Sequence, residues 1–100
     1  MVKPLERLED SLTRSNTWIY ILSLVSKRKL HGYTVADEIE KEFGWIPGFI
    51  TPYVVLYKLE NEGYVKKTEK GRRIYYTITK EGKQALQTAK KMLHKTADSF

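Results

Sequence analysis

The sequence TPYVVLYKLENEGYVKKTEKGRRIYYTIT, which spans residues 51–79, decides the fold of this 100-residue chain. Its first part predicts a helix over residues 52–62. Thr51 is expected to cap this helix by accepting a first-turn N–H, and Pro52 suits the next position because a first turn leaves its N–H groups unpaired. Gly63 should end the helix, since glycine readily adopts the left-handed backbone that follows many last turns.

A basic hairpin follows this helix directly. Residues 64–69 and 73–79 have the composition of strands, and Gly71 between them supplies the positive φ that a tight turn needs. Alternation predicts that Val65, Ile74, Tyr76 and Ile78 point toward the core and that Lys66, Tyr75, Thr77 and Thr79 face outward or sideways. A helix beside a hairpin tipped with cations is a geometry suited to contact with duplex DNA.

Positive charge is concentrated in the second part of the chain. The formal net charge is +6, yet residues 1–63 contain 8 Lys and Arg against 9 Asp and Glu. Residues 64–95 contain 10 Lys and Arg against only Glu69 and Glu81. This clustering is typical of a surface that binds a polyanion, although a charged surface can also serve solubility alone.

Apolar residues at helical spacing predict further helices over residues 4–13, 17–27, 34–43 and 80–97. The helix over residues 17–27 is apolar nearly all round and should be buried at the centre of the domain. Ser15 or Asn16 is expected to cap it, and Thr34 with Asp37 to form a capping box for the next helix. The sequence Leu30-His31-Gly32-Tyr33 is predicted to be a turn.

These elements predict an α+β fold that is mostly α: a winged helix-turn-helix with a two-stranded β wing and a C-terminal dimerisation helix. We expect a single domain over residues 1–100. Its winged-helix core would span residues 15–79, with an N-terminal helix within residues 1–14 and the dimerisation helix within residues 80–100.

The last helix has an apolar stripe that a small domain does not need for its own core. With the first helix it supplies the candidate dimer-interface residues, which are Leu5, Leu8, Leu12, Leu86, Ala89, Leu93 and Phe100. A second copy of the chain is the simplest cover for such a stripe. The alternative is that the last helix folds back on its own domain.

The chain resembles the PadR family of transcriptional regulators over about residues 17–86. The matching motifs are Ile21-Leu22-Ser23-Leu24, Leu30-His31-Gly32-Tyr33, Thr51-Pro52-Tyr53, Leu59-Glu60-Asn61-Glu62-Gly63, the wing GRRIYYTIT at residues 71–79, and Glu81-Gly82. The resemblance implies a homodimer with the terminal helices at its interface, and repression of target promoters. It also implies a small-molecule effector, of unknown identity, bound between the subunits. Trp18 and Trp45 lie outside the last helix, which argues against a flat aromatic drug pocket built from that helix.

Candidate DNA-binding residues lie on the predicted 52–62 helix and on the wing. On the helix they are Thr51, Tyr53, Tyr57 and Lys58, because the first turns of such a helix approach base edges and phosphates. On the wing they are Lys66, Lys67 and Lys70, expected on the phosphate backbone, and Arg72 and Arg73, expected in the minor groove. The alternatives are that Tyr53 is a partly buried core residue and that the charges of the wing are simply solvated.

Nothing in the sequence indicates an enzyme or a cofactor, since it has no phosphate-binding glycine-rich loop and no set of nucleophile, base and acid. Cysteine is absent, and His31 and His94 have no accompanying ligand set, which argues against a metal site. The most apolar stretch, residues 18–25, is too short to cross a bilayer. We therefore expect no membrane partner and a cytoplasmic, nucleoid-associated protein.

The favoured hypothesis is a sequence-specific transcriptional regulator that represses as a homodimer on a pseudo-palindromic site in double-stranded DNA. A sequence-tolerant architectural DNA binder is the first alternative, since Val54 and the tyrosines beside it could discriminate bases weakly. The second alternative is a winged helix used for protein–protein contact, in which Tyr53, Tyr57 and Tyr75 bind a partner protein.

Overall fold

The computed structural model describes residues 3–100 and confirms a mostly helical α+β winged helix. Its elements are α1 (Pro4–Leu12), α2 (Thr17–Lys27), β1 (Leu30–His31), α3 (Val35–Phe43), α4 (Thr51–Asn61), β2 (Val65–Lys70), β3 (Arg73–Ile78) and α5 (Lys80–Asp98). Short 3₁₀ turns, Arg14–Asn16 and Gly32–Thr34, precede α2 and α3.

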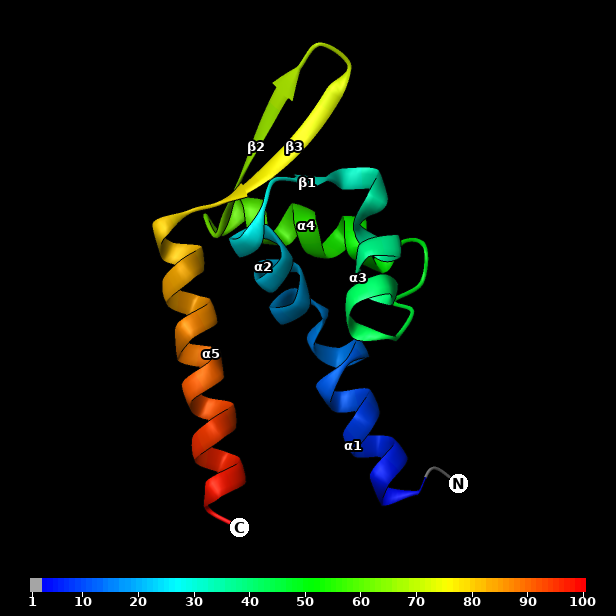
Figure 1. Cartoon of the computed structure of the whole chain (residues 1–100), viewed down its shortest axis with the longest axis vertical. Coiled ribbons are helices and arrows are strands. Elements are labelled where there is room, and N and C mark those ends of the chain that lie inside the picture. Colours follow the sequence, from blue (N-terminus) through cyan, green and yellow to red (C-terminus); the bar gives the residue numbers. More distant parts are fainter. Residues whose placement is uncertain (1–2) are drawn as a thin grey trace.

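The wing formed by β2 and β3 extends from one end of the molecule, and α1 and α5 extend from the other (Figure 1). Helices α2, α3 and α4 lie between these two ends, with α4 crossing the molecule near the base of the wing. The molecule is therefore elongated, with principal extents of 48 × 29 × 22 Å.

The hydrophobic core gathers around α2, as its apolar sequence predicts. Ile21, Leu22, Leu24 and Val25 are all buried there. The other buried members of the same cluster are Leu30, Val35, Ile39, Leu56, Leu59 and Val65. One helix thus anchors α3, α4 and the base of the sheet, because each contributes an apolar side chain to the surface of α2.

The sheet has three strands rather than two, in the order β1-β3-β2. Residues predicted as a turn include the short strand β1, in which Leu30 pairs with Tyr76 and His31 with Tyr75, antiparallel. Two residues are too few to show an alternating pattern, so this strand could not be predicted locally. The predicted two-stranded wing is present as β2 and β3, and the prediction of a turn at Leu30-His31 is corrected to a third strand that joins the base of the wing.

The predicted alternation of the hairpin holds, with one exception at its tip. Val65 is buried, and Tyr76 and Ile78 are half-buried against the core. Ile74, predicted to point into the core, is 40% exposed. Ile74 lies on the same face as Tyr76. At this position, however, the hairpin extends past the helices, so no helix covers the side chain.

One predicted helix cap is wrong, and two are right in position but make no side-chain cap bond. Helix α4 begins at Thr51 itself, and the N-cap is Ile50, whose carbonyl accepts hydrogen bonds from the N–H groups of Tyr53 and Val54. The Thr34 hydroxyl donates to the carbonyl of His31 instead of forming a capping box. Asn16 holds the N-cap position of α2 without a side-chain cap bond. Backbone geometry rather than a side-chain oxygen therefore starts these helices.

A hydrogen-bonded joint fixes the base of the wing to both α4 and α5. The Thr79 hydroxyl donates to the carbonyl of Gly63, 2.6 Å away, and accepts from the N–H of Gly82 at 3.0 Å. The Thr79 N–H donates to the carbonyl of Tyr64. A Cβ added at Gly82 would lie 2.1 Å from that Tyr64 carbonyl oxygen, so no larger residue fits. We call these contacts the Thr79–Gly82 joint.

Candidate nucleic-acid interface

Helix α4 divides into a buried stripe and an exposed face. Pro52, Leu56 and Leu59 pack into the core at helical spacing. The opposite face exposes Tyr53, Val54, Tyr57, Lys58 and Asn61. The predicted site residues Tyr53, Tyr57 and Lys58 therefore share one accessible surface, and Tyr53 is not a core residue.

Thr51 is exposed in the first turn of α4. It does not cap the helix, so its hydroxyl is not engaged in that role. The helix dipole places partial positive charge at this end of α4, where Pro52 has no N–H and those of Tyr53 and Val54 already donate to the Ile50 carbonyl. The start of α4 therefore suits a phosphate or another anion.

The strand register divides the cations of the wing between two faces. Directly paired residues share a face, so the outer face contains the pairs Lys66–Thr77, Thr68–Tyr75 and Lys70–Arg73. The inner face contains Val65–Ile78, Lys67–Tyr76 and Glu69–Ile74. Lys67 thus shares its face with the one acidic residue of the wing, whereas every charged residue on the outer face of the hairpin is a cation. Arg72 lies in the turn between the two strands.

Strand β1 adds residues to the outer face that sequence reasoning missed. The His31 ring lies 4.4 Å from the Tyr75 ring, and the Lys29 ammonium is 5.4 Å from the centre of the same ring. The pKa of Arg73 is raised above its ordinary value. The main cause is a hydrogen bond with Tyr75, and electrostatic interactions with Tyr75 and Tyr33 add to it. Nothing local predicts the contact between Lys29 and Tyr75, because it depends on the pairing of β1 with a strand more than forty residues away.

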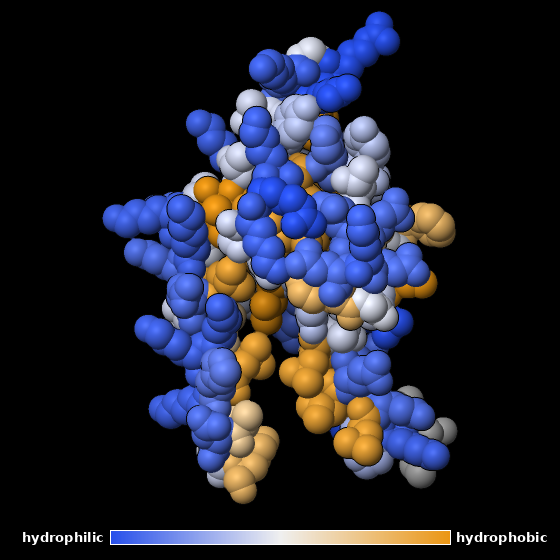
Figure 2. All heavy atoms as spheres, viewed as in Figure 1, coloured by the Kyte–Doolittle hydropathy of each residue, from blue (hydrophilic) through white to orange (hydrophobic). Residues whose placement is uncertain are grey.

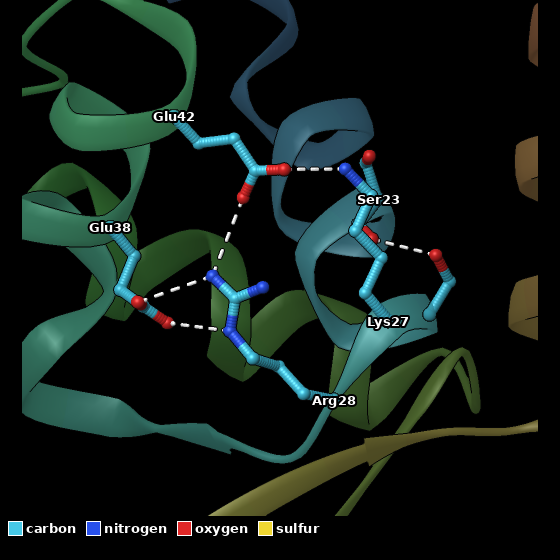
Figure 3. A network of polar contacts seen from close by, with 6 residues as sticks. Ser23, Lys27, Arg28, Glu38 and Glu42 are labelled. Atoms are coloured by element: carbon cyan, nitrogen blue, oxygen red, sulfur yellow. Dashed lines mark hydrogen bonds and ion pairs between the residues drawn. The ribbon is translucent and has the colours of Figure 1, made fainter.

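The cations at the junction of α2 and α3 are neutralised by carboxylates (Figure 3). Lys27 pairs with Glu42, and Arg28 lies 3.2 Å from Glu38 and 3.3 Å from Glu42. The hydrogen bond from Lys27, and then that from Arg28, holds the pKa of Glu42 below its ordinary value. This network leaves little positive charge for a polyanion.

The wing differs in this respect. Within residues 3–100, no ion pair shorter than 4.0 Å involves a lysine or arginine of β2, β3 or the turn between them. All five predicted wing cations are exposed: Lys66, Lys67, Lys70, Arg72 and Arg73. An exposed helix face beside a hairpin with unpaired cations is the arrangement of a winged-helix DNA-binding protein.

The comparisons with known proteins specify the family. Residues 21–88 match the Transcriptional regulator PadR-like family, and the chain belongs to that family. It is therefore a PadR-family transcriptional regulator with the DNA-binding winged-helix fold. No curated protein sequence matches the chain.

Solved structures of several regulators share the fold. A transcriptional regulator from Clostridium thermocellum superposes with a TM-score of 0.80 at 24% identity, over 89% of this chain and 93% of that chain. Bacillus subtilis PadR, solved in complex with operator DNA, gives a TM-score of 0.61 at 32% identity, over 72% of this chain and 45% of that one. H. salinarum RosR gives a TM-score of 0.68 at 26% identity, over 91% of this chain and 81% of that chain. This chain thus matches less than half of the B. subtilis protein.

The predicted dimer-interface residues fall into two groups. Leu86 is half-buried against the core and Ala89 is buried, so the first half of α5 packs on its own domain. The remaining residues are exposed: Leu5, Leu8 and Leu12 on α1, Leu93 on α5, and Phe100 after it. The alternative that α5 folds back on its own domain therefore holds for its first half alone.

An apolar groove separates α1 from α5. It has a volume of about 700 Å³, and the residues that line it include Leu12, Trp18, Tyr20, Met92 and Leu93. Apolar side chains face each other across this gap at the lower end of the molecule (Figure 2). No helix within residues 3–100 is both long enough and apolar enough to cross a lipid bilayer.

Proposed function

We propose that the protein is a homodimeric repressor that binds a pseudo-palindromic operator in a sequence-specific way. The observation that carries this proposal is the separation of two surfaces. The exposed face of α4 and the unpaired cations of the wing suit DNA, whereas exposed leucines on α1 and α5 suit a second copy of the chain. Such a protein acts in the cytoplasm, on the nucleoid.

In the dimer, α4 of each subunit enters the major groove, and the two helices lie about 34 Å apart on successive turns of the duplex. Tyr53, Tyr57 and Lys58 contact base edges and phosphates from the exposed face, and Thr51 contacts phosphate at the start of the helix. The wing lies along the flanking backbone with Lys66, Lys67 and Lys70, and Arg72 and Arg73 enter the minor groove. B. subtilis PadR, solved in complex with operator DNA, supports the proposal that this chain binds an operator.

The dimer interface would cover the exposed leucines. No residue of α1 is buried, so this helix gains stability chiefly by packing against something outside its own domain. Leu5, Leu8 and Leu12 would pack against the second half of α5 of the partner subunit. The effector implied by the family resemblance would then bind in or beside the apolar groove between α1 and α5.

Selection of bound fragments from a random duplex pool tests sequence specificity. We expect recovery of a site with two-fold symmetry, bound at least a hundredfold more tightly than random duplex at the same salt concentration. Placing that site over a promoter should lower transcription when the protein is added. Equal affinity for every duplex and for heparin would contradict the proposal and favour an architectural binder, and higher transcription would contradict repression.

The double substitution Leu8→Asp and Leu93→Asp tests the dimer. Both side chains are exposed, so the charges should leave the fold intact while placing carboxylates in the apolar interface. We expect monomers in sedimentation analysis and a loss of operator affinity of more than tenfold, because two linked sites become one. Lys90→Asp is the control, because Lys90 is exposed on α5 and lies outside its apolar stripe. Dimers that persist in the double variant would exclude this interface.

A further inference from the structure

The loop between α3 and α4 exposes large apolar side chains immediately before the helix that contacts DNA. Phe49 is 92% exposed and Ile50 is 74% exposed. Apolar side chains protrude from the edge of the molecule at this loop (Figure 2). Contiguous exposed apolar residues of this size are typical of a binding surface.

The exposure of these two residues is built into the loop. Trp45 packs edge-to-face on Tyr20, with ring centres 5.0 Å apart, and Pro47 is buried. The loop is therefore anchored on the core by these two side chains, while Phe49 and Ile50 point away from it. The backbone of Ile50 is fixed as well, because its carbonyl accepts the first hydrogen bonds of α4.

Ile50 continues the exposed face of α4 toward its N-terminus. Ile50, Tyr53, Val54 and Tyr57 follow the spacing i, i+3, i+4 and i+7, which places them on one side of the helix. All four are exposed. From Gly44 to Leu59 the sequence contains no Asp or Glu, and Lys58 is its one charged residue. Nothing on this surface repels phosphate, and most of it is apolar.

We propose that Phe49 and Ile50 determine operator specificity by contacting thymine methyl groups in the major groove. This inference rests on the proposed function, because it requires α4 to enter that groove. The thymine C5-methyl is the apolar feature of the major-groove edge, and apolar side chains discriminate bases through it. N-terminal residues of a recognition helix lie closest to the bases, which is where these two side chains are.

Replacing thymine by deoxyuridine tests the proposal, since this change removes the methyl group alone. The DNA is the duplex that the wild-type protein selects from a random pool, with each thymine replaced in turn. At the contacted positions we expect wild-type affinity to fall about fourfold per methyl, the value for one buried methyl group. The variant Phe49→Ala with Ile50→Ala should bind the thymine duplex more weakly and should not distinguish thymine from deoxyuridine there.

Ile46→Ala is the control, because Ile46 is also an exposed apolar residue of the same loop but precedes the buried Pro47 and has no place on the exposed face of α4. Whatever its overall affinity, this variant should keep the full wild-type response to deoxyuridine. Equal responses in the wild type and the double loop variant would overturn the proposal while leaving the proposed function intact. Unchanged DNA binding by the double loop variant, together with loss of a bound protein partner, would also overturn the proposal. Failure to select any duplex would overturn both.

Discussion

Two groups of cations in this protein differ in what surrounds them. Lys27 and Arg28, at the end of α2, are paired with Glu38 and Glu42 of α3. Arg72 and Arg73, at the tip of the wing, have no carboxylate within ion-pair distance among residues 3–100. The same residue types therefore fasten two helices together at one place and remain available to an external anion at the other. Net charge alone does not distinguish these roles.

The largest expected effect is on DNA binding by the wing. Arg72→Ala with Arg73→Ala should lower operator affinity roughly tenfold to a hundredfold and reduce the slope of log affinity against log salt by about two. Each guanidinium would displace about one counterion from the duplex. Fluorescence anisotropy at several salt concentrations measures both quantities.

The matched control is Lys27→Ala with Arg28→Ala, which removes the same formal charge. Because these side chains are already neutralised by Glu38 and Glu42, the salt slope should stay near the wild-type value. An equal fall in slope for the two double variants would show that only overall charge matters. The distinction between the two groups would then fail.

A smaller effect is expected from the one acidic residue of the wing. Glu69 lies on the inner face of the hairpin, the face that also contains Lys67. Glu69→Gln should raise operator affinity by about twofold, since it removes a screened repulsion from phosphate. The same assay at low salt measures this gain, and a loss of affinity would show that Glu69 positions Lys67.

The smallest effect concerns the paired group and depends on pH. Because Lys27 and Arg28 lower the pKa of Glu42 from its ordinary value of 4.5, its contribution to stability is complete above that pH. The contribution is lost as the pH falls through the lower pKa of the folded state. Glu42→Gln should therefore melt below the wild type at pH 7, and the two curves should converge on acidification. Thermal unfolding across that range measures this difference.

Glu40→Gln supplies the control for the pH experiment, because Glu40 is exposed on the same helix. Its melting curve should stay close to that of the wild type at every pH. A difference between wild type and Glu42→Gln that persists at the acid end of the range would assign the effect to lost packing rather than to the ion pairs.

Much of this architecture could be predicted from local patterns. Gly63 and Gly71 adopt positive φ where a helix end and a turn were expected, and the buried stripe of α4 follows its apolar spacing. Strand β1 was missed because two residues show no alternation and their partner strand is distant in sequence. The cap at Thr51 was wrong because a side chain suited to capping gives no information about where the backbone turns.

The candidate interface was predictable to a similar degree. Tyr53, Tyr57 and Lys58 could be placed on one face because helical spacing determines it. The exposure of Phe49 was missed, since an apolar residue in a loop has no periodicity to show whether it packs inward. The pairing of Lys27 and Arg28 was also missed, because it depends on how α3 packs beside α2. In each case the missing information was a tertiary contact.

The Thr79–Gly82 joint has a mechanical consequence. At a flexible connection between two elements, one element can tilt without moving the other. Here the first turn of α5 touches the backbone of Tyr64 so closely that no methyl group fits between them. A swing of α5 must therefore displace the hairpin and the end of α4 together, so that a change in the angle of α5 moves both parts of the candidate interface.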